Sequence, residues 1–151
     1  MMNKESMEIS TNRQIQLAAR PIGKPRQEDL ILVETNVAIP KEGQILVKNH
    51  FLSLDPYMRG RMNPSKSYAK PVEVGDVMTG GTVGEVLESY NSDFQPGDMV
   101  VGIGGWQEYS IMDNNQCTKI DPQWPSPSLG LGVLGMPGIT AYTGLGNIGK
   151  P

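Results

Sequence analysis

Side chains that could act as nucleophiles, bases or metal ligands are few in this 151-residue chain. It has one cysteine, Cys117, and one histidine, His50, which excludes an internal disulfide, a Cys-x-x-Cys redox pair and a cysteine-based zinc site. A Ser-His-Asp or Cys-His arrangement would have to use His50, which lies in a strand-like run without an acidic neighbour in sequence. We interpret Cys117 as a passive thiol on a strand and expect no catalysis from His50.

Carboxylates offer no metal site either, because they are scattered over a predicted strand and its turn. We expect these side chains to face solvent: Glu73, Asp76, Glu85 and Glu88. Paired carboxylates for glycoside chemistry remain open, but nothing singles out two of them.

Two glycine-rich segments, residues 130–135 and 144–149, match the spacing G-x-G-x-x-G of dinucleotide phosphate binding. That fingerprint requires a buried strand before it, a helix opening at its third glycine and an acidic residue about twenty positions later. The first match follows a proline-rich loop, and the second runs into Lys150 and Pro151, where proline disfavours helix. We interpret both as glycines that allow close helix packing.

Composition describes one ordinary globular domain, with 38% apolar and 19% charged residues. The formal charge of -3 is spread over interspersed charges, so no nucleic-acid partner is predicted. No apolar stretch is long enough to span a bilayer, and no membrane partner is expected. Residues 1–12 contain no apolar run and are interpreted as a flexible tail rather than a secretory signal, which leaves the cytoplasm as the expected location.

Glycine and proline divide the chain into short pieces rich in Val, Ile, Thr and Tyr, a pattern typical of strands and turns. Tight turns are predicted at residues 40–43 and 94–98, and a bulge or sharp bend at residues 80–84. The run from residue 52 to residue 62 is interpreted as a strand that leaves the sheet into a turn. Seven short strands without long helices imply a small barrel or sandwich. The predicted strands are residues 15–19, 30–39, 44–53, 77–88, 99–103, 107–112 and 117–120.

Three prolines within residues 121–128 cannot continue a sheet and predict a boundary there. Beyond it, Ser128 could cap a short helix that runs to Met136, and residues 138–145 could form a second helix. The sequence then stops at Pro151 without a closing core element, from which we expect an expressed fragment.

Four segments in order carry a resemblance: Asp-Pro-Tyr-Met-Arg at residues 55–59, and residues 80–86, 95–100 and 135–145. On these segments, residues 14–151 resemble the N-terminal half of the medium-chain dehydrogenase/reductase superfamily. The similarity is to the branch of leukotriene B4 12-hydroxydehydrogenase, prostaglandin reductases and curcumin reductase.

The resemblance implies a mainly β fold with short helices, a GroES-like, partly open β-barrel, with the Rossmann domain absent from this chain. The expected organisation is a tail at residues 1–12, a barrel substrate domain at residues 13–124 and short helices at residues 125–151 that lead to the missing cofactor domain. Zinc-using members have a cysteine and a Gly-His-Glu run where this chain has Leu-Asp-Pro at 54–56 and Thr-Gly-Gly at 79–81. The zinc-independent branch, with no metal ligands, is therefore expected.

Such enzymes transfer a hydride from NADPH to the β-carbon of an α,β-unsaturated ketone or aldehyde. The resemblance implies that the missing domain binds most of the NADPH, that the full-length protein is a homodimer, and that this fragment alone is inactive. We assign Tyr57 and Tyr68 to substrate binding and Met136 and Thr140 to contact with the cofactor; the catalytic residue is left unknown. A quinone reductase of the same superfamily and a GroES-like binding module without enzymatic activity are the alternatives.

Overall fold

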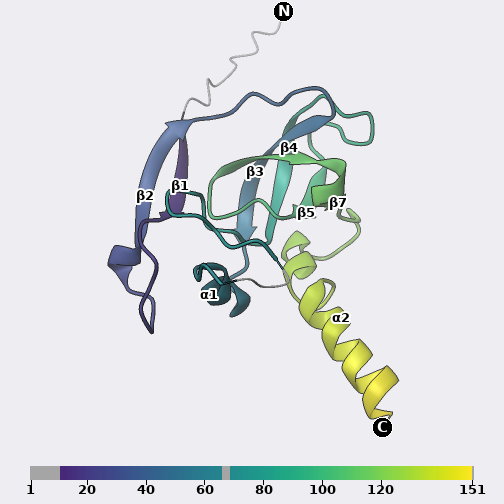
Figure 1. Ribbon diagram of the computed structural model, residues 1–151. Coiled ribbons are helices and arrows are strands. Elements are labelled where there is room, and N and C mark those ends of the chain that lie inside the picture. Colours follow the sequence, from purple (N-terminus) through teal and green to yellow (C-terminus); the bar gives the residue numbers. More distant parts are fainter. Residues whose placement is uncertain (1–10, 66–68, 151) are drawn as a thin grey trace, which may run out of the picture.

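The computed structural model describes residues 11–65 and 69–150, and in them every strand pairing is antiparallel. A two-stranded sheet joins β1 (Thr11–Leu17) and β2 (Leu30–Asn36). A five-stranded sheet has the order β6-β3-β4-β5-β7 (Figure 1). Its strands are β3 (Gln44–Leu52), β4 (Thr82–Ser89), β5 (Met99–Gly102), β6 (Tyr109–Asp113) and β7 (Cys117–Lys119). The predicted mainly β, partly open barrel is confirmed.

Backbone and side-chain hydrogen bonds attach the small sheet to the large one. Isolated bridges pair Gln14 with Gln107 and Gln16 with Val77. The buried amide of Asn12 donates to the carbonyl of Tyr109 at 2.9 Å and accepts from the Tyr109 N–H at 3.0 Å. These contacts curl β1 against the outer strand β6 without a continuous ladder, so the barrel stays partly open.

Two apolar clusters form the core. The first lies within the five-stranded sheet and comprises Ile45, Val47, Val86, Val100, Met112 and Cys117. The second lies under the short helix α1 (Tyr57–Arg61) and comprises Leu17, Met58, Met62, Val72 and Met78. Burial of these side chains is the main stabilising contribution to the fold, at roughly 25 cal/mol for each Å² of apolar surface removed from water.

A bend in the long β3–β4 pair lies where the glycines predicted it. Asn49 is opposite Gly84 and Phe51 is opposite Val83, so His50 is an extra residue on β3. The extra residue of this bulge is therefore on β3. Gly84, the glycine that allows the two strands to lie close together, is on β4. The predicted start of β4 at residue 77 is wrong, because Val77 makes only a single bridge and the strand begins at Thr82.

The turn at residues 94–98 is confirmed, with Gly97 at a φ of +93°. Asp98 accepts the Gln95 N–H at 2.8 Å and lies 2.7 Å from the ammonium group of Lys119 on β7. Burial alone would raise the pKa of Asp98, but the hydrogen bonds from Lys119 and from the Gln95 backbone outweigh it and hold the pKa below its ordinary value of 3.8.

We expect Asp98→Asn to destabilise the chain at neutral pH but not in acid. A carboxylate whose pKa is lowered by folding stabilises the folded state above its unfolded pKa, and that contribution is lost as the pH falls through the folded pKa, here below 3.8. The measurement is the urea midpoint of both proteins from pH 7 to pH 3. The difference should shrink below pH 4, whereas Asp76→Asn, at an exposed carboxylate, should give no such convergence. A pH-independent difference for Asp98→Asn would contradict this role.

The 3-10 helices η1 (Gln27–Asp29) and η2 (Asn114–Gln116) lie directly before β2 and β7, and a third, η3 (Pro127–Leu131), lies between β7 and the C-terminal helices. The predicted cap at Ser128 is wrong, because η3 begins at Pro127 and its N-cap position is Ser126. The interpretation of residues 52–62 as strand and turn missed helix α1 within them.

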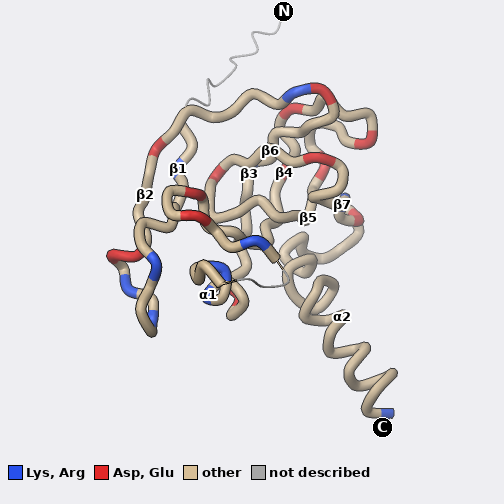
Figure 2. The backbone as a smooth tube through the Cα atoms, viewed as in Figure 1, with Lys and Arg blue, Asp and Glu red and all other residues tan. Residues whose placement is uncertain are grey.

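At the C-terminal end, α2 (Met136–Tyr142) continues into a π-helix, η4 (Thr143–Gly149), and together they project from the barrel (Figure 1). The projecting helix carries no charge before Lys150, whereas charges of both signs are interspersed over the barrel (Figure 2). Its apolar side chains are exposed: Met136, Ile139, Tyr142, Leu145 and Ile148. Within the described ranges, no helix is both long and apolar enough to cross a membrane.

Candidate functional site

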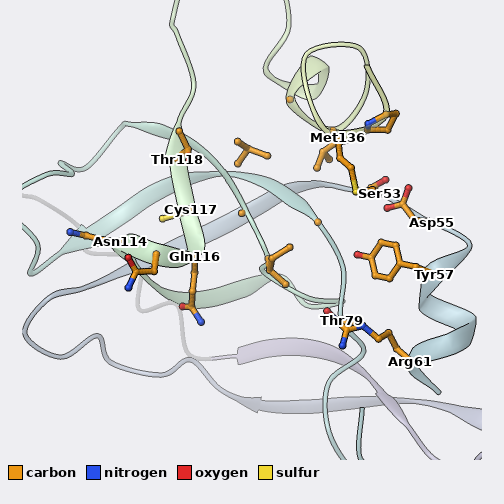
Figure 3. A pocket seen from close by; sticks show the side chains of 18 residues that line it. Ser53, Asp55, Tyr57, Arg61, Thr79, Asn114, Gln116, Cys117, Thr118 and Met136 are labelled. Carbon is orange, nitrogen blue, oxygen red and sulfur yellow. The ribbon is translucent and has the colours of Figure 1, made fainter. Parts of the chain in front are cut away.

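A pocket of about 490 Å³ lies where α1, the β5–β7 edge of the large sheet and the start of α2 meet (Figure 3). Apolar atoms of Val101, Ile103 and Leu131 form part of its wall. Polar groups line it as well: Ser53, Asp55, Tyr57, Arg61, Thr79, Asn114, Asn115, Gln116 and Thr118. The pocket can hold a small organic molecule against an apolar wall while hydrogen-bonding groups orient it.

Two of the four residues assigned from sequence, Tyr57 and Met136, line this pocket although 79 positions separate them (136 − 57). Tyr57 extends its ring from the first residue of α1, and Met136 extends its thioether from the first residue of α2 (Figure 3). The ring of Tyr57 also packs against the core cluster under α1, which supports it from behind.

The other two assigned residues are not brought to the pocket by the described structure. Thr140 does not line it, and its hydroxyl donates to the carbonyl of Met136 at 2.8 Å, an ordinary contact within a helix. Tyr68 lies outside the described residues.

Sequence reasoning did not single out several residues that line the pocket beside Tyr57. Ser53 and Asp55 follow the end of β3, Thr79 precedes β4, and Arg61 is one helical turn after Tyr57. Asp55 is the first residue of the Asp-Pro-Tyr-Met-Arg segment and Arg61 lies two positions after it, so that motif was the available signal; nothing local marked Thr79 or Ile103.

His50 and Arg59 do not line the pocket. The His50 imidazole is 3.6 Å from the Glu85 carboxylate, a partner that pairing with β4 supplies and that the local sequence does not reveal. The guanidinium of Arg59 bonds to backbone carbonyls of the loop around Gly23. In the described parts of the chain, no group of three or more His, Cys, Asp or Glu side chains could hold a metal ion.

The glycine-rich segments differ in what their glycines do. A Cβ on Gly135 would lie 2.1 Å from the Gly130 carbonyl oxygen, so this glycine permits a close backbone approach as expected. Gly144 and Gly146 have no described atom within 4 Å of such a Cβ, so the packing interpretation is not supported there. Neither segment follows a strand and opens a helix toward the pocket in the manner of a phosphate-binding turn.

Cys117 is the first residue of β7. It is buried, and it is also one of the residues that line the pocket. Burial raises the pKa of its thiol, and the nearby Asp113 carboxylate raises it further. The thiolate is the nucleophilic form, so the environment suppresses reactivity at neutral pH.

We expect Cys117 of the folded chain to react with Ellman's reagent at pH 7 at least about tenfold more slowly than the same residue in urea, because folding both buries it and raises its pKa. The rate of thionitrobenzoate release measures this, with glutathione as the reference thiol. Equal rates in buffer and in urea would show that Cys117 is accessible and that its environment has been misjudged.

Comparison with known proteins adds to this geometry. A family model described as the N-terminal domain of oxidoreductase matches residues 13–120. The chain is 52% identical over 140 residues to NADPH-dependent curcumin reductase of Escherichia coli K12, with 93% of this chain and 41% of that protein covered. It is 39% identical over 146 residues to a 2-alkenal reductase (NADP(+)-dependent) of Nicotiana tabacum, covering 93% and 43%.

A solved structure of CurA from Vibrio vulnificus in complex with NADPH superposes with a TM-score of 0.85 at 48% identity, and the match covers 92% of this chain and 41% of that one. The chain therefore spans well under half the length of these relatives. Because the family model covers most of the sequence and the motifs agree with it, the chain belongs to the family of oxidoreductase N-terminal domains of the medium-chain dehydrogenase/reductase superfamily.

Proposed function

We propose that this domain is the substrate side of an NADPH-dependent oxidoreductase that reduces the C=C bond of α,β-unsaturated ketones or aldehydes. The observation that carries the proposal is the pocket in which Tyr57 and Met136 meet, in a chain whose relatives are named as curcumin and alkenal reductases. No feature of the pocket favours a quinone, and the quinone reductases among the similar solved structures are 24%, 16% and 19% identical.

The chemistry explains why a hydroxyl group belongs in such a pocket. Addition of hydride to the β-carbon of an enone places negative charge on the carbonyl oxygen, and a donor aimed at that oxygen lowers the barrier. The Tyr57 hydroxyl donates this hydrogen bond, and its ring supplies apolar surface to the substrate. Transfer of a proton to the enolate carbon requires another group, to which no residue of this chain is assigned.

The described residues fit the nicotinamide end of NADPH and not its diphosphate. A flat, largely apolar ring matches the wall made by Ile103, Leu131 and Met136, and when bound the cofactor supplies the hydride. Met136 is 59% exposed, so its thioether is available for contact with a ring. The hydroxyl oxygen of Thr140 can only accept, since its proton is donated within the helix. Neither G-x-G-x-x-G segment directly follows a strand, and the glycines at the end of β5, within residues 102–105, lead into a loop and not into the N-terminus of a helix.

The proposal includes three features of the whole protein: independence from zinc and a homodimeric state, which the resemblance implies, and a cytoplasmic location, which is the expectation drawn from residues 1–12. The first is supported by Leu-Asp-Pro at residues 54–56 and Thr-Gly-Gly at residues 79–81, which offer one carboxylate and no thiol or imidazole.

The decisive experiment is NADPH oxidation by the full-length protein with a panel of enones, quinones and saturated alcohols, after treatment with a chelator. Turnover confined to enones supports the proposal. Equal or better turnover of quinones would redirect it to quinone reduction, and no turnover with any acceptor would favour a binding module. Loss of activity with the chelator would contradict independence from zinc.

A further inference from the structure

Helix α1 carries Tyr57 into the pocket, yet little within the helix fixes its orientation. It has five residues, a length that is marginal for an isolated helix, and Pro56 at its N-cap makes no side-chain capping bond. Met58 and Met62 anchor it in the core cluster beneath. Thioether side chains have three rotatable bonds and adapt to their surroundings, so they hold the helix down without defining its rotation or tilt.

The end of α1 is tied to residues 70–72, because the Arg61 carbonyl accepts the Val72 N–H at 2.8 Å and the Arg61 guanidinium donates to the Lys70 carbonyl. Arg59 adds a constraint from another side of the helix. Its Nη2 donates to the carbonyl of Gly23 at 2.7 Å and to that of Pro21 at 3.2 Å, and its Nε also reaches the Gly23 carbonyl at 3.1 Å. Its Nη1 donates to the Asn63 side chain at 2.7 Å, just past the end of the helix. One guanidinium therefore joins α1 to the loop at residues 21–23, where Gly23 turns the chain with a φ of +76°.

Arg20 makes the reciprocal connection from that loop. Its Nη1 donates to the carbonyl of Met62, the C-cap residue of α1, at 2.8 Å, and to that of Val72 at 2.9 Å. Its Nη2 is held by the carboxylate of Glu73 at 2.8 Å. Arg59 of the helix thus donates to backbone carbonyls of the loop, and Arg20 beside the loop donates to the backbone carbonyl at the end of the helix. Two connections at different points fix the rotation of the helix as well as its position.

The two arginines do not enter the pocket. Tyr57 and Arg61, four positions apart, share one face of α1 and both line the pocket, whereas Arg59 lies two positions from each and points to the opposite side. Any effect of Arg59 on the contents of the pocket must therefore pass through the helix.

We propose that Arg59 and Arg20 are positioning residues that set where the Tyr57 hydroxyl lies in the pocket. This inference rests on the proposed function, in which that hydroxyl stabilises the developing charge on the substrate oxygen. Lysine would keep the charge of Arg59 but not its function, because an ammonium group cannot reach two carbonyls and an amide in the fixed directions of the guanidinium fork.

The kinetic test uses Arg59→Lys in the full-length protein, in the wild-type and the Tyr57→Phe backgrounds. We expect kcat for an enone to fall about tenfold in the wild-type background, because small misplacements of a positioned group are costly, and less than about twofold in the Tyr57→Phe background. The same pattern is expected for Arg20→Lys. Equal losses in both backgrounds would overturn the proposal, since a purely structural role would not depend on the hydroxyl. Arg26→Lys is the matched control, because Arg26 is exposed and contacts only Glu28 through its side chain.

A second readout requires no activity and separates this inference from the proposed function. The 151-residue chain labelled with 3-fluorotyrosine has five tyrosines, and the signal lost in Tyr57→Phe assigns residue 57 in the 19F NMR spectrum. Arg59→Lys should shift or broaden that signal and leave those of Tyr90 and Tyr109 in place, while Arg26→Lys should change none of them. An unchanged Tyr57 signal in Arg59→Lys would overturn the inference even if the enzyme reduces enones. A shifted signal without any enone turnover would support the positioning while the proposed function fails.

Discussion

Replacing Gly84 by alanine is expected to destabilise the fold more than any exposed substitution, by about 3 kcal/mol. Gly84 lies in the buried centre of the β3–β4 pair, and a Cβ there would be 2.4 Å from the Lys48 carbonyl oxygen and 2.6 Å from Cγ1 of Val47. Backbone atoms of a paired strand cannot move aside as the end of a flexible side chain can. A loss of this size is a large part of the 5–15 kcal/mol that typically separates folded from unfolded domains.

Urea unfolding followed by tryptophan fluorescence measures this loss, with Trp106 reporting on the core cluster against which it packs. Gly146→Ala is the matched control, because no described atom lies within 4 Å of its Cβ and the site is exposed. The control should unfold within about 0.5 kcal/mol of the wild type. If Gly84→Ala were as stable as Gly146→Ala, the close approach of β3 and β4 would be contradicted.

Tyr57→Phe in the full-length protein is expected to lower kcat for enones about 100-fold while the KM changes little. Removal of one donor from an oxyanion-stabilising site costs this much when the bond forms mainly in the transition state. Phenylalanine keeps the ring that packs against the core cluster, so the substitution removes only the hydroxyl group. Steady-state NADPH oxidation with a single enone at varied concentration separates kcat from KM.

Tyr90→Phe removes the same atom from a tyrosine whose hydroxyl donates to the Glu88 carboxylate and which does not line the pocket, so its kcat should match the wild type. If Tyr57→Phe retained more than half of the wild-type kcat, the hydroxyl would not be the donor. A rise in KM alone would assign Tyr57 to substrate binding without a role in the transition state.

The strands were predictable from sequence because each is short, rich in β-formers and ended by a turn with its own chemistry, as at Gly97. The boundaries of the strands were harder to predict from sequence. The segment that begins at Val77 has the composition of a strand, but Val77 makes only one bridge, to Gln16 of β1, and β4 begins at Thr82. Strand pairing is decided by tertiary contacts, which composition does not reveal. Residues 143–149 form a π-helix that no periodicity in the sequence indicated.

The site was predictable only where a motif carried it. The Asp-Pro-Tyr-Met-Arg segment and the Met136 segment led to Tyr57 and Met136, which line the same pocket. The other lining residues come from distant parts of the sequence, so the sequence did not indicate which of them would line it. Thr140 was assigned by the type of its side chain, whereas helix geometry directs its proton to the carbonyl four residues earlier. The bonding of Arg59 was hidden in the same way, because the Gly23 carbonyl that its guanidinium engages is 36 positions away in sequence.

The methionines of this domain differ in their exposure to oxidants. Peroxide converts a thioether to a polar, chiral sulfoxide, which is disruptive in an apolar contact. Met58, Met62 and Met78 are at most 4% exposed, so the packing that anchors α1 also protects their sulfur atoms. Met136 is 59% exposed and forms part of the apolar wall of the pocket. Oxidative damage would therefore reach the pocket before it reached the core, and the domain would lose this apolar binding surface while its fold remained intact.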